Sequence, residues 1–115
     1  MFFPEGRFKV FVYGKPTDMR KSFHGLYGLT KQVLGEDPLS GHLFVFINRR
    51  GNYLKVFYFD RTGYCIWAKR LERGRYQWNR PETTQIEWTD LKLILEGIDR
   101  RQTRQYLRYH HTVKK

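Results

Sequence analysis

The chain has 115 residues, which is enough for one domain with a single core and too few for two. Its 22 Lys and Arg residues against 11 Asp and Glu residues give a formal net charge of +11, so it should attract polyanions. No stretch has the ~18 consecutive apolar residues of a membrane span, the N-terminus lacks the pattern of a signal peptide, and a lone cysteine, Cys65, excludes an internal disulfide. We therefore expect a cytoplasmic, nucleoid-associated protein with no membrane contact.

The first elements should be a strand and a helix. Alternation over Arg7–Tyr13 predicts a strand with Phe8, Val10 and Val12 on one face and Lys9, Phe11 and Tyr13 on the other. Thr17 is a suitable N-cap for a helix that ends before Gly35. Its expected apolar stripe is Met19, Phe23, Leu26, Leu29 or Thr30, and Val33. Gly25 and Gly28 lie within the helix and predict that it packs closely on the sheet.

A run of strands should follow. We predict strands over His42–Asn48, Tyr53–Asp60, Tyr64–Arg70 and Arg75–Trp78, and a short edge strand over Gln85–Trp88. Because the connections are too short for crossovers, the strands should form an antiparallel meander, with Gly63 taking a positive φ in one turn. Thr89 could then cap a last helix, whose buried face is Leu91, Ile94, Leu95 and Ile98.

The predicted fold class is α+β: an N-terminal strand and helix, an antiparallel meander of four to five strands, and a C-terminal helix. We expect one domain over residues 1–98 and a basic tail or helix extension over residues 99–115, because Asp99 is the only acid in that segment.

The meander strands are apolar on both faces, which two interpretations explain. In the first, helices cover one face and a dimer partner or the tail covers the other. In the second, one face stays open and its aromatic side chains stack on bases. The chain has no aromatic motif of an RNA-recognition sheet, which weakens the second interpretation.

Basic residues concentrate in turns and in the tail. In the turns this favours contact with phosphates over a merely solvated surface. For the tail two interpretations stay open, a helix that lies along a phosphate backbone and a frayed, solvated end. One hairpin turn carries two arginines and the opposite turn one, a second group surrounds Gly74, and the tail has arginines at helical spacing. The predicted nucleic-acid-binding residues are Arg49, Arg50, Arg61, Lys69, Arg70, Arg73, Arg75, Arg100, Arg101, Arg104 and Arg108.

Catalytic and metal-binding chemistry has little support in the sequence. Asp60, Asp90, Glu96 and Asp99 are not spaced so as to converge on a metal, and Asp60 and Asp90 suit a hairpin turn and a helix N-terminus. There is no phosphate-binding glycine loop and no nucleophile motif. We therefore predict no catalytic residue, no metal and no cofactor.

Four blocks resemble a known family. They are TDMRKSFHGL over Thr17–Leu26, DPLSGHLFVF over Asp37–Phe46, KRLERGRYQW over Lys69–Trp78 and LEGID over Leu95–Asp99. Together they resemble the TnpB accessory proteins of insertion-sequence family sixty-six, which are distinct from the RNA-guided nucleases of the same name. Ser22 departs from that pattern, which often has Gly there, and the tail lies beyond the shared core.

The resemblance implies a bacterial transposable element whose transposase is TnpC and whose other accessory protein is TnpA. It implies a non-enzymatic accessory protein of DNA transposition that binds the element's DNA, the transposase complex, or both. Two alternatives stay open: a protein-interaction module or homodimer scaffold without direct DNA readout, and a small metal-independent ribonuclease.

Overall fold

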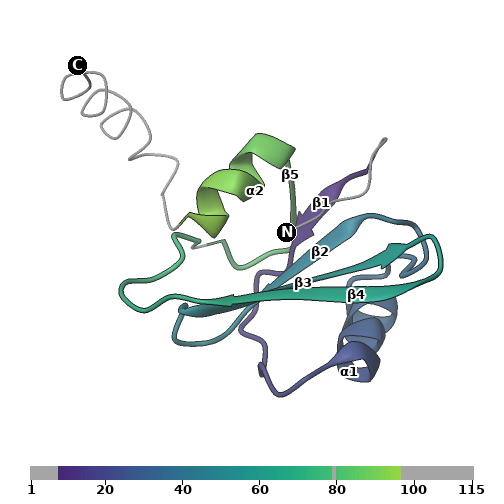
Figure 1. The fold of residues 1–115 in the computed structure, drawn as a ribbon, viewed down its shortest axis with the longest axis horizontal. Helices are drawn as coiled ribbons and strands as arrows, with labels where there is room; N and C mark the ends of the chain where they lie inside the picture. Colours follow the sequence, from purple (N-terminus) through teal and green to yellow (C-terminus); the bar gives the residue numbers. More distant parts are fainter. Residues whose placement is uncertain (1–7, 79, 97–115) are drawn as a thin grey trace.

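The computed structural model describes residues 8–78 and 80–96, which form the predicted α+β fold (Figure 1). Strands and helices follow in the order β1 (Val10–Val12), α1 (Phe23–Gly28), the π-helical turn η1 (Leu29–Val33), β2 (Leu43–Ile47), β3 (Tyr53–Asp60), β4 (Gly63–Arg70), β5 (Thr84–Ile86) and α2 (Trp88–Leu95). Neither helix in these residues is long and apolar enough to cross a membrane.

The five strands form one mixed sheet in the order β4-β3-β2-β1-β5. Short turns join β2, β3 and β4, so these strands are antiparallel as predicted. The meander does not extend further, because β1 pairs parallel to β2, with Val10 opposite Leu43. The intervening segment, which contains α1 and η1, makes this parallel pairing possible. β5 is the predicted short edge strand, although it begins one residue and ends two residues earlier than predicted, and it pairs antiparallel with β1.

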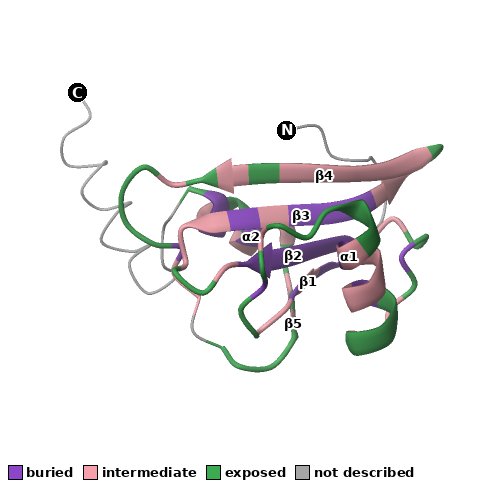
Figure 2. Ribbon diagram, turned by 90° about the horizontal axis from the view of Figure 1, so that it is seen from below, coloured by how far each residue is buried: buried purple, intermediate pink, exposed green. Residues whose placement is uncertain are grey.

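Both faces of the sheet are covered by helices of the same chain, on opposite sides in Figure 1. On one side Val10, Val45 and Val56 pack in a cluster that includes Leu91 of α2. On the other side Phe44, Phe46 and Phe57 pack with Leu26 of α1. These three phenylalanines have no exposed surface. The expectation that a partner, the tail or stacked bases would cover one face is therefore wrong for β2, which is buried along its whole length in Figure 2, and for the buried residues of β3.

The first helix differs from the predicted one. It begins at Phe23, not after Thr17, and widens into η1, where the N–H of Leu34 donates to the carbonyl of Leu29 (2.9 Å). Of the predicted apolar stripe, Leu26 and Thr30 are buried whereas Phe23 and Val33 are exposed.

The helix glycines do not serve the close approach to the sheet that we predicted. A Cβ at Gly28 would meet nothing within 4 Å, and the three atoms nearest to one at Gly25 would all belong to the Lys21 side chain. Gly35 does follow the helix end with a φ of +70°, as its position after the last helical residue predicts.

Two further local predictions are wrong. Arg75–Trp78 is irregular and not a strand, because the N–H of Tyr76 bonds to the Gly51 carbonyl of the neighbouring turn. In the β3–β4 turn the positive φ belongs to Arg61 and not to Gly63.

The last helix has a different N-cap from the predicted one. The N-cap is Glu87, whose N–H bonds to the carboxylate of Asp90, and not Thr89. Its buried residues Leu91, Ile94 and Leu95 are those predicted, whereas Ile98 and the proposed boundary near residue 98 lie outside the described residues.

Candidate nucleic-acid interface

A hydrogen-bonded turn between β2 and β3 presents two of the predicted arginines. The side-chain oxygen of Asn48 accepts from the N–H groups of Asn52 (3.0 Å) and Tyr53 (3.1 Å). Gly51 supplies the positive φ of +73° that this tight turn requires. Arg49 and Arg50 are exposed at its tip, so their guanidinium groups are held on a fixed backbone.

The loop after β4 folds back onto the same turn. The N–H of Leu71 donates to the Asn52 carbonyl and the N–H of Tyr76 to the Gly51 carbonyl, both at 2.7 Å. Arg73 and Arg75 are both exposed in this loop. These bonds bring residues more than twenty positions apart in sequence to one end of the sheet.

Arg70 joins this group from the end of β4. It pairs with Tyr53, the first residue of β3, and its guanidinium lies over the Tyr53 ring, 4.5 Å from the centroid. Such cation–π contact orients the side chain while the guanidinium edges stay able to donate. We call the following set of exposed cations the basic end: Lys15, Arg49, Arg50, Arg70, Arg73 and Arg75.

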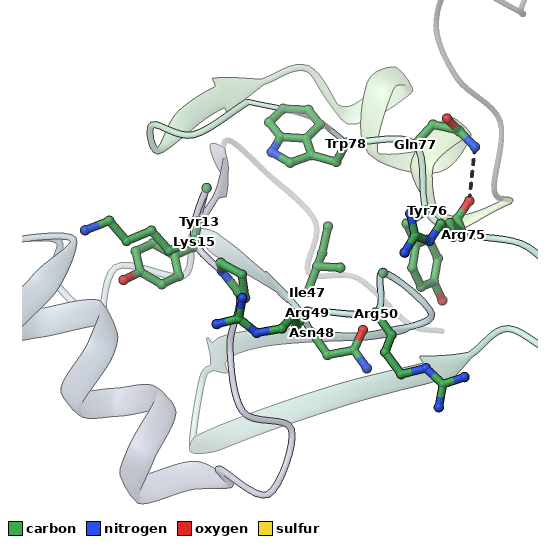
Figure 3. Close-up of a pocket in the computed structure, with 13 residues that line it drawn as sticks. Tyr13, Lys15, Ile47, Asn48, Arg49, Arg50, Arg75, Tyr76, Gln77 and Trp78 are labelled. Carbon is green, nitrogen blue, oxygen red and sulfur yellow. Dashed lines mark hydrogen bonds between the residues drawn. The ribbon is translucent and has the colours of Figure 1, made fainter.

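A cleft of about 250 Å³ opens within the basic end (Figure 3). It lies beyond the carboxyl ends of the parallel strands β1 and β2, and the segment Arg75–Trp78 also lines it. No carboxylate-bearing residue is among the described residues that line it. Other lining residues, such as Tyr13, Lys15 and Trp78, were not predicted, because no motif links them across the chain.

Two predicted binding residues do not belong to this surface. Arg61 lies in the β3–β4 turn, at the opposite end of the sheet. The ammonium of Lys69 donates to the carbonyl of Leu95 at 2.9 Å, so it stabilises the C-terminus of α2. Arg100, Arg101, Arg104 and Arg108 lie outside the described residues and stay predictions.

Tyr76 anchors the loop that carries Arg75. Its side chain is buried, its hydroxyl donates to the Lys69 carbonyl at 2.9 Å, and burial raises its pKa to about 12. In the unfolded chain a tyrosine ionises near pH 10, so above that pH the unfolded state loses the proton first. The stability that Tyr76 contributes is therefore complete below pH 10 and lost as the pH rises towards 12.

We expect Tyr76→Phe to lower the free energy of unfolding by about 1 kcal/mol at pH 7, because the hydroxyl's hydrogen bond is lost. The variant should also lose less stability than the original protein between pH 10 and 12. Urea unfolding at pH 7, 9, 10 and 11 measures both effects. If the two proteins lost stability in parallel above pH 10, Tyr76 would not be the responsible group.

Candidate metal ligands do not gather in the described part of the chain. No group of three His, Cys, Asp or Glu side chains is placed there to hold a metal ion. Asp90 bonds at the start of α2, in the helix N-terminal role that the sequence suggested.

The sequence of this chain matches a known protein family. A family model described as IS66 Orf2-like protein matches residues 8–105. The chain belongs to the IS66 Orf2-like family. The recognition from four sequence blocks is thereby confirmed, and the protein is an accessory protein associated with transposition of an insertion sequence.

Two relatives come from Sinorhizobium fredii (strain NBRC 101917 / NGR234). Uncharacterized protein y4hO is 41% identical over 93 residues, covering 79% of this chain and 81% of the relative. Uncharacterized protein y4jC is 33% identical over 101 residues, covering 86% of each chain. No solved structure matches the chain.

Proposed function

We propose that this IS66 Orf2-like protein is a non-enzymatic accessory factor that binds DNA of its own insertion sequence through the basic end. The observation that carries the proposal is the convergence of arginines from the β2–β3 turn and from the loop after β4, which hydrogen bonds hold together. The tail arginines Arg100, Arg101, Arg104 and Arg108 extend the same proposal to the C-terminus.

Phosphate is the ligand that this surface suits. Arginine offers a rigid fork of donors that matches phosphate oxygens, and five arginines of the basic end are exposed. The surplus of positive charge over the whole chain would speed the encounter with a polyanion. Phosphate contacts position a protein on DNA without reading sequence, so most of the affinity should be independent of sequence.

A salt series tests the proposal. If about five phosphates are neutralised, the binding constant should fall with a slope of about −4.5 against the logarithm of salt concentration. Affinity for a labelled duplex from an element end should then drop about 500-fold between 50 and 200 mM salt, measured by fluorescence anisotropy. Absence of binding at 50 mM salt would contradict the proposal.

A second candidate function is docking onto other transposition proteins, such as TnpA, the transposase TnpC or a second copy. Three large apolar side chains favour it: Phe23 is 49% exposed, Val33 56% and Leu39 57%. All three lie in the segment from α1 to the start of β2 and are not among the residues of the basic end. Pulldown of TnpA and TnpC from nuclease-treated extract, compared with a Phe23→Ser variant, separates protein docking from contact through shared DNA.

A further inference from the structure

β4 lies at an edge of the sheet but has the side-chain pattern of an interior strand. Among the described residues it pairs with β3 alone, and it forms the outer edge of the sheet in Figure 2. Tyr64 and Ile66 pack with the cluster on the α1 side of the sheet. Cys65 and Trp67 pack with the cluster on the α2 side. Strands that are apolar on both faces are typical of positions inside a sheet, yet all four side chains are only half-buried here.

The two edges of the sheet differ in how they are protected against pairing with another chain. β5 has three residues and follows shortly after Pro81, and short edge strands and prolines are two usual protections. β4 has eight residues and pairs with β3 in continuous register from Gly63 to Arg70, without a bulge or a proline. Its charged residues are the last two, so the run Tyr64–Ala68 carries no charge that would repel a further strand.

The backbone groups on the outer edge of β4 belong to its even-numbered residues. The N–H of Leu71, which follows β4, donates to the carbonyl of Asn52. Because backbone groups alternate in direction along an antiparallel pair, the odd-numbered residues of β4 bond to β3 in the same way. The N–H and carbonyl groups of Tyr64, Ile66 and Ala68 therefore point away from β3, where the described residues supply no further strand.

A second copy of β4 complements this edge about a two-fold axis at Ile66. In antiparallel pairing Ile66 then lies opposite its own counterpart, and residues on the same face of the sheet meet. Each larger side chain is opposite a smaller one, because Trp67 meets Cys65 of the other copy and Tyr64 meets Ala68. The edge therefore matches itself in hydrogen bonding and in side-chain size, as an interface between identical chains requires.

The same arrangement keeps the charges of the two copies apart. Lys69 lies opposite Gly63, and Arg70 lies beyond the paired residues, so no two charges are opposed along the paired strands. The basic end adjoins Arg70, and antiparallel pairing places the two basic ends at opposite ends of the joined sheet. This separation is important because each copy has a net charge of +11.

We propose that two copies of the chain pair through β4, antiparallel and in register around Ile66, to form a dimer with one continuous sheet. The inference stands on the geometry of β4 and goes beyond the proposed DNA binding. Its consequence for that function is that one dimer holds two DNA segments, because its basic ends face in opposite directions.

Sedimentation equilibrium of the nuclease-treated full chain tests for the dimer, and variants of Ala68 test the surface. Ala68 is exposed and its N–H points outward, so Ala68→Pro removes a donor from the outer edge and none from the pairing with β3. Its dimer dissociation constant should rise at least about 30-fold, since each copy loses a hydrogen bond. Ala68→Ser is the matched control, because it keeps the N–H and a small side chain, and it should change the constant less than about twofold.

Salt distinguishes this dimer from association through shared DNA. Screening weakens the repulsion between two positively charged copies, so the dimer should tighten between about 0.1 and 1 M salt. Association through residual DNA would weaken over the same range.

Trp67→Cys tests the register. Trp67 lies opposite Cys65 of the other copy in a non-hydrogen-bonded pair, where Cα atoms are ~4.5 Å apart, within the ~4.4–6.8 Å range of disulfides. Oxidised glutathione should therefore link this variant into a covalent dimer on a non-reducing gel. The original protein, and Trp67→Cys combined with Cys65→Ser, should stay unlinked.

Thermal unfolding shows whether each variant folds, and if Ala68→Pro does not fold, the disulfide test decides. A protein that stays monomeric at every concentration would overturn the inference, as would a dimer equally tight in Ala68→Pro. A monomer whose pulldown of TnpC is abolished by Ala68→Pro would assign the edge to a strand of the transposase instead. None of these results affects the proposed function, which fails only if the protein does not bind DNA.

Discussion

Gly14→Ala should destabilise the protein by about 3 kcal/mol, the upper end of the range for overpacked sites. A Cβ at this position would overlap the carbonyl group of Pro81 and would lie 2.6 Å from the carbonyl oxygen of Glu82. Both neighbours are backbone atoms, which cannot move aside as the end of a flexible side chain can. The segment leading into β5 would have to separate from the end of β1. Urea unfolding followed by circular dichroism measures the loss.

Gly28→Ala provides a control with the opposite sign. Gly28 has helical dihedral angles (φ −60°, ψ −44°), and a Cβ there would meet no atom within 4 Å. Alanine should therefore stabilise the protein by about 0.5–1 kcal/mol, since it has the higher helix propensity. A Gly14→Ala variant as stable as the original protein would show that the contact with Pro81 and Glu82 does not form.

The second large effect concerns DNA. Replacing Arg49, Arg50 and Arg75 together by Gln should reduce the salt slope of duplex binding by about 3, because each phosphate contact contributes about 0.9. At 100 mM salt the affinity should fall at least about 30-fold, since three charge-assisted contacts are lost. Anisotropy titrations at several salt concentrations give both quantities.

A charge-matched control distinguishes DNA binding at the basic end from DNA binding that depends only on the total charge of the protein. Lys9, Lys31 and Arg61 are exposed. Lys9 precedes β1 and Arg61 follows β3, both at the end of the sheet opposite the basic end. Lys31 lies in η1, directly after α1. The Tyr27 ring of α1 contacts Tyr64 near the start of β4, which is also at that opposite end. Replacing these three by Gln removes the same charge and should lower the slope by less than about 1. Equal losses in the two triple variants would mean that DNA contacts the protein without a preferred surface.

Local signals in the sequence were enough to predict much of the sheet. The short turns around Gly51 and after Asp60 define the antiparallel hairpins, and the alternation of Val10 and Val12 with Phe11 places their side chains on the correct faces. The buried residues of α2 follow from helical spacing. Each of these features depends on contacts between near neighbours in the chain.

Features that depend on contacts between residues far apart in the sequence could not be predicted from local patterns. The parallel pairing of β1 with β2 had an available signal, a helix between two strands, but alternation alone does not give strand direction. Nothing in the order of residues indicates that Lys69 reaches the carbonyl of Leu95 while Arg70 lies over Tyr53. Adjacent residues of a strand point to opposite faces, so Lys69 has a structural role whereas Arg70, the next residue, is exposed.

Only the part of the candidate site that depends on local sequence could be predicted. The turn and loop arginines were identified from their clustering, yet their convergence depends on the bonds from Leu71 and Tyr76 to the β2–β3 turn. The cleft is also lined by Tyr13 and Trp78, which come from segments far apart in sequence.

The pairing of β1 with β5 also constrains when the protein can finish folding. β1 is made first on the ribosome, whereas β5 pairs with it from near the far end of the described residues, with Val10 opposite Ile86. The hairpins of β2, β3 and β4 can form early, because their contacts are local. Until Thr84–Ile86 has emerged, one edge of β1 has no strand partner, so a chain interrupted before that point exposes an apolar strand edge able to pair with other chains.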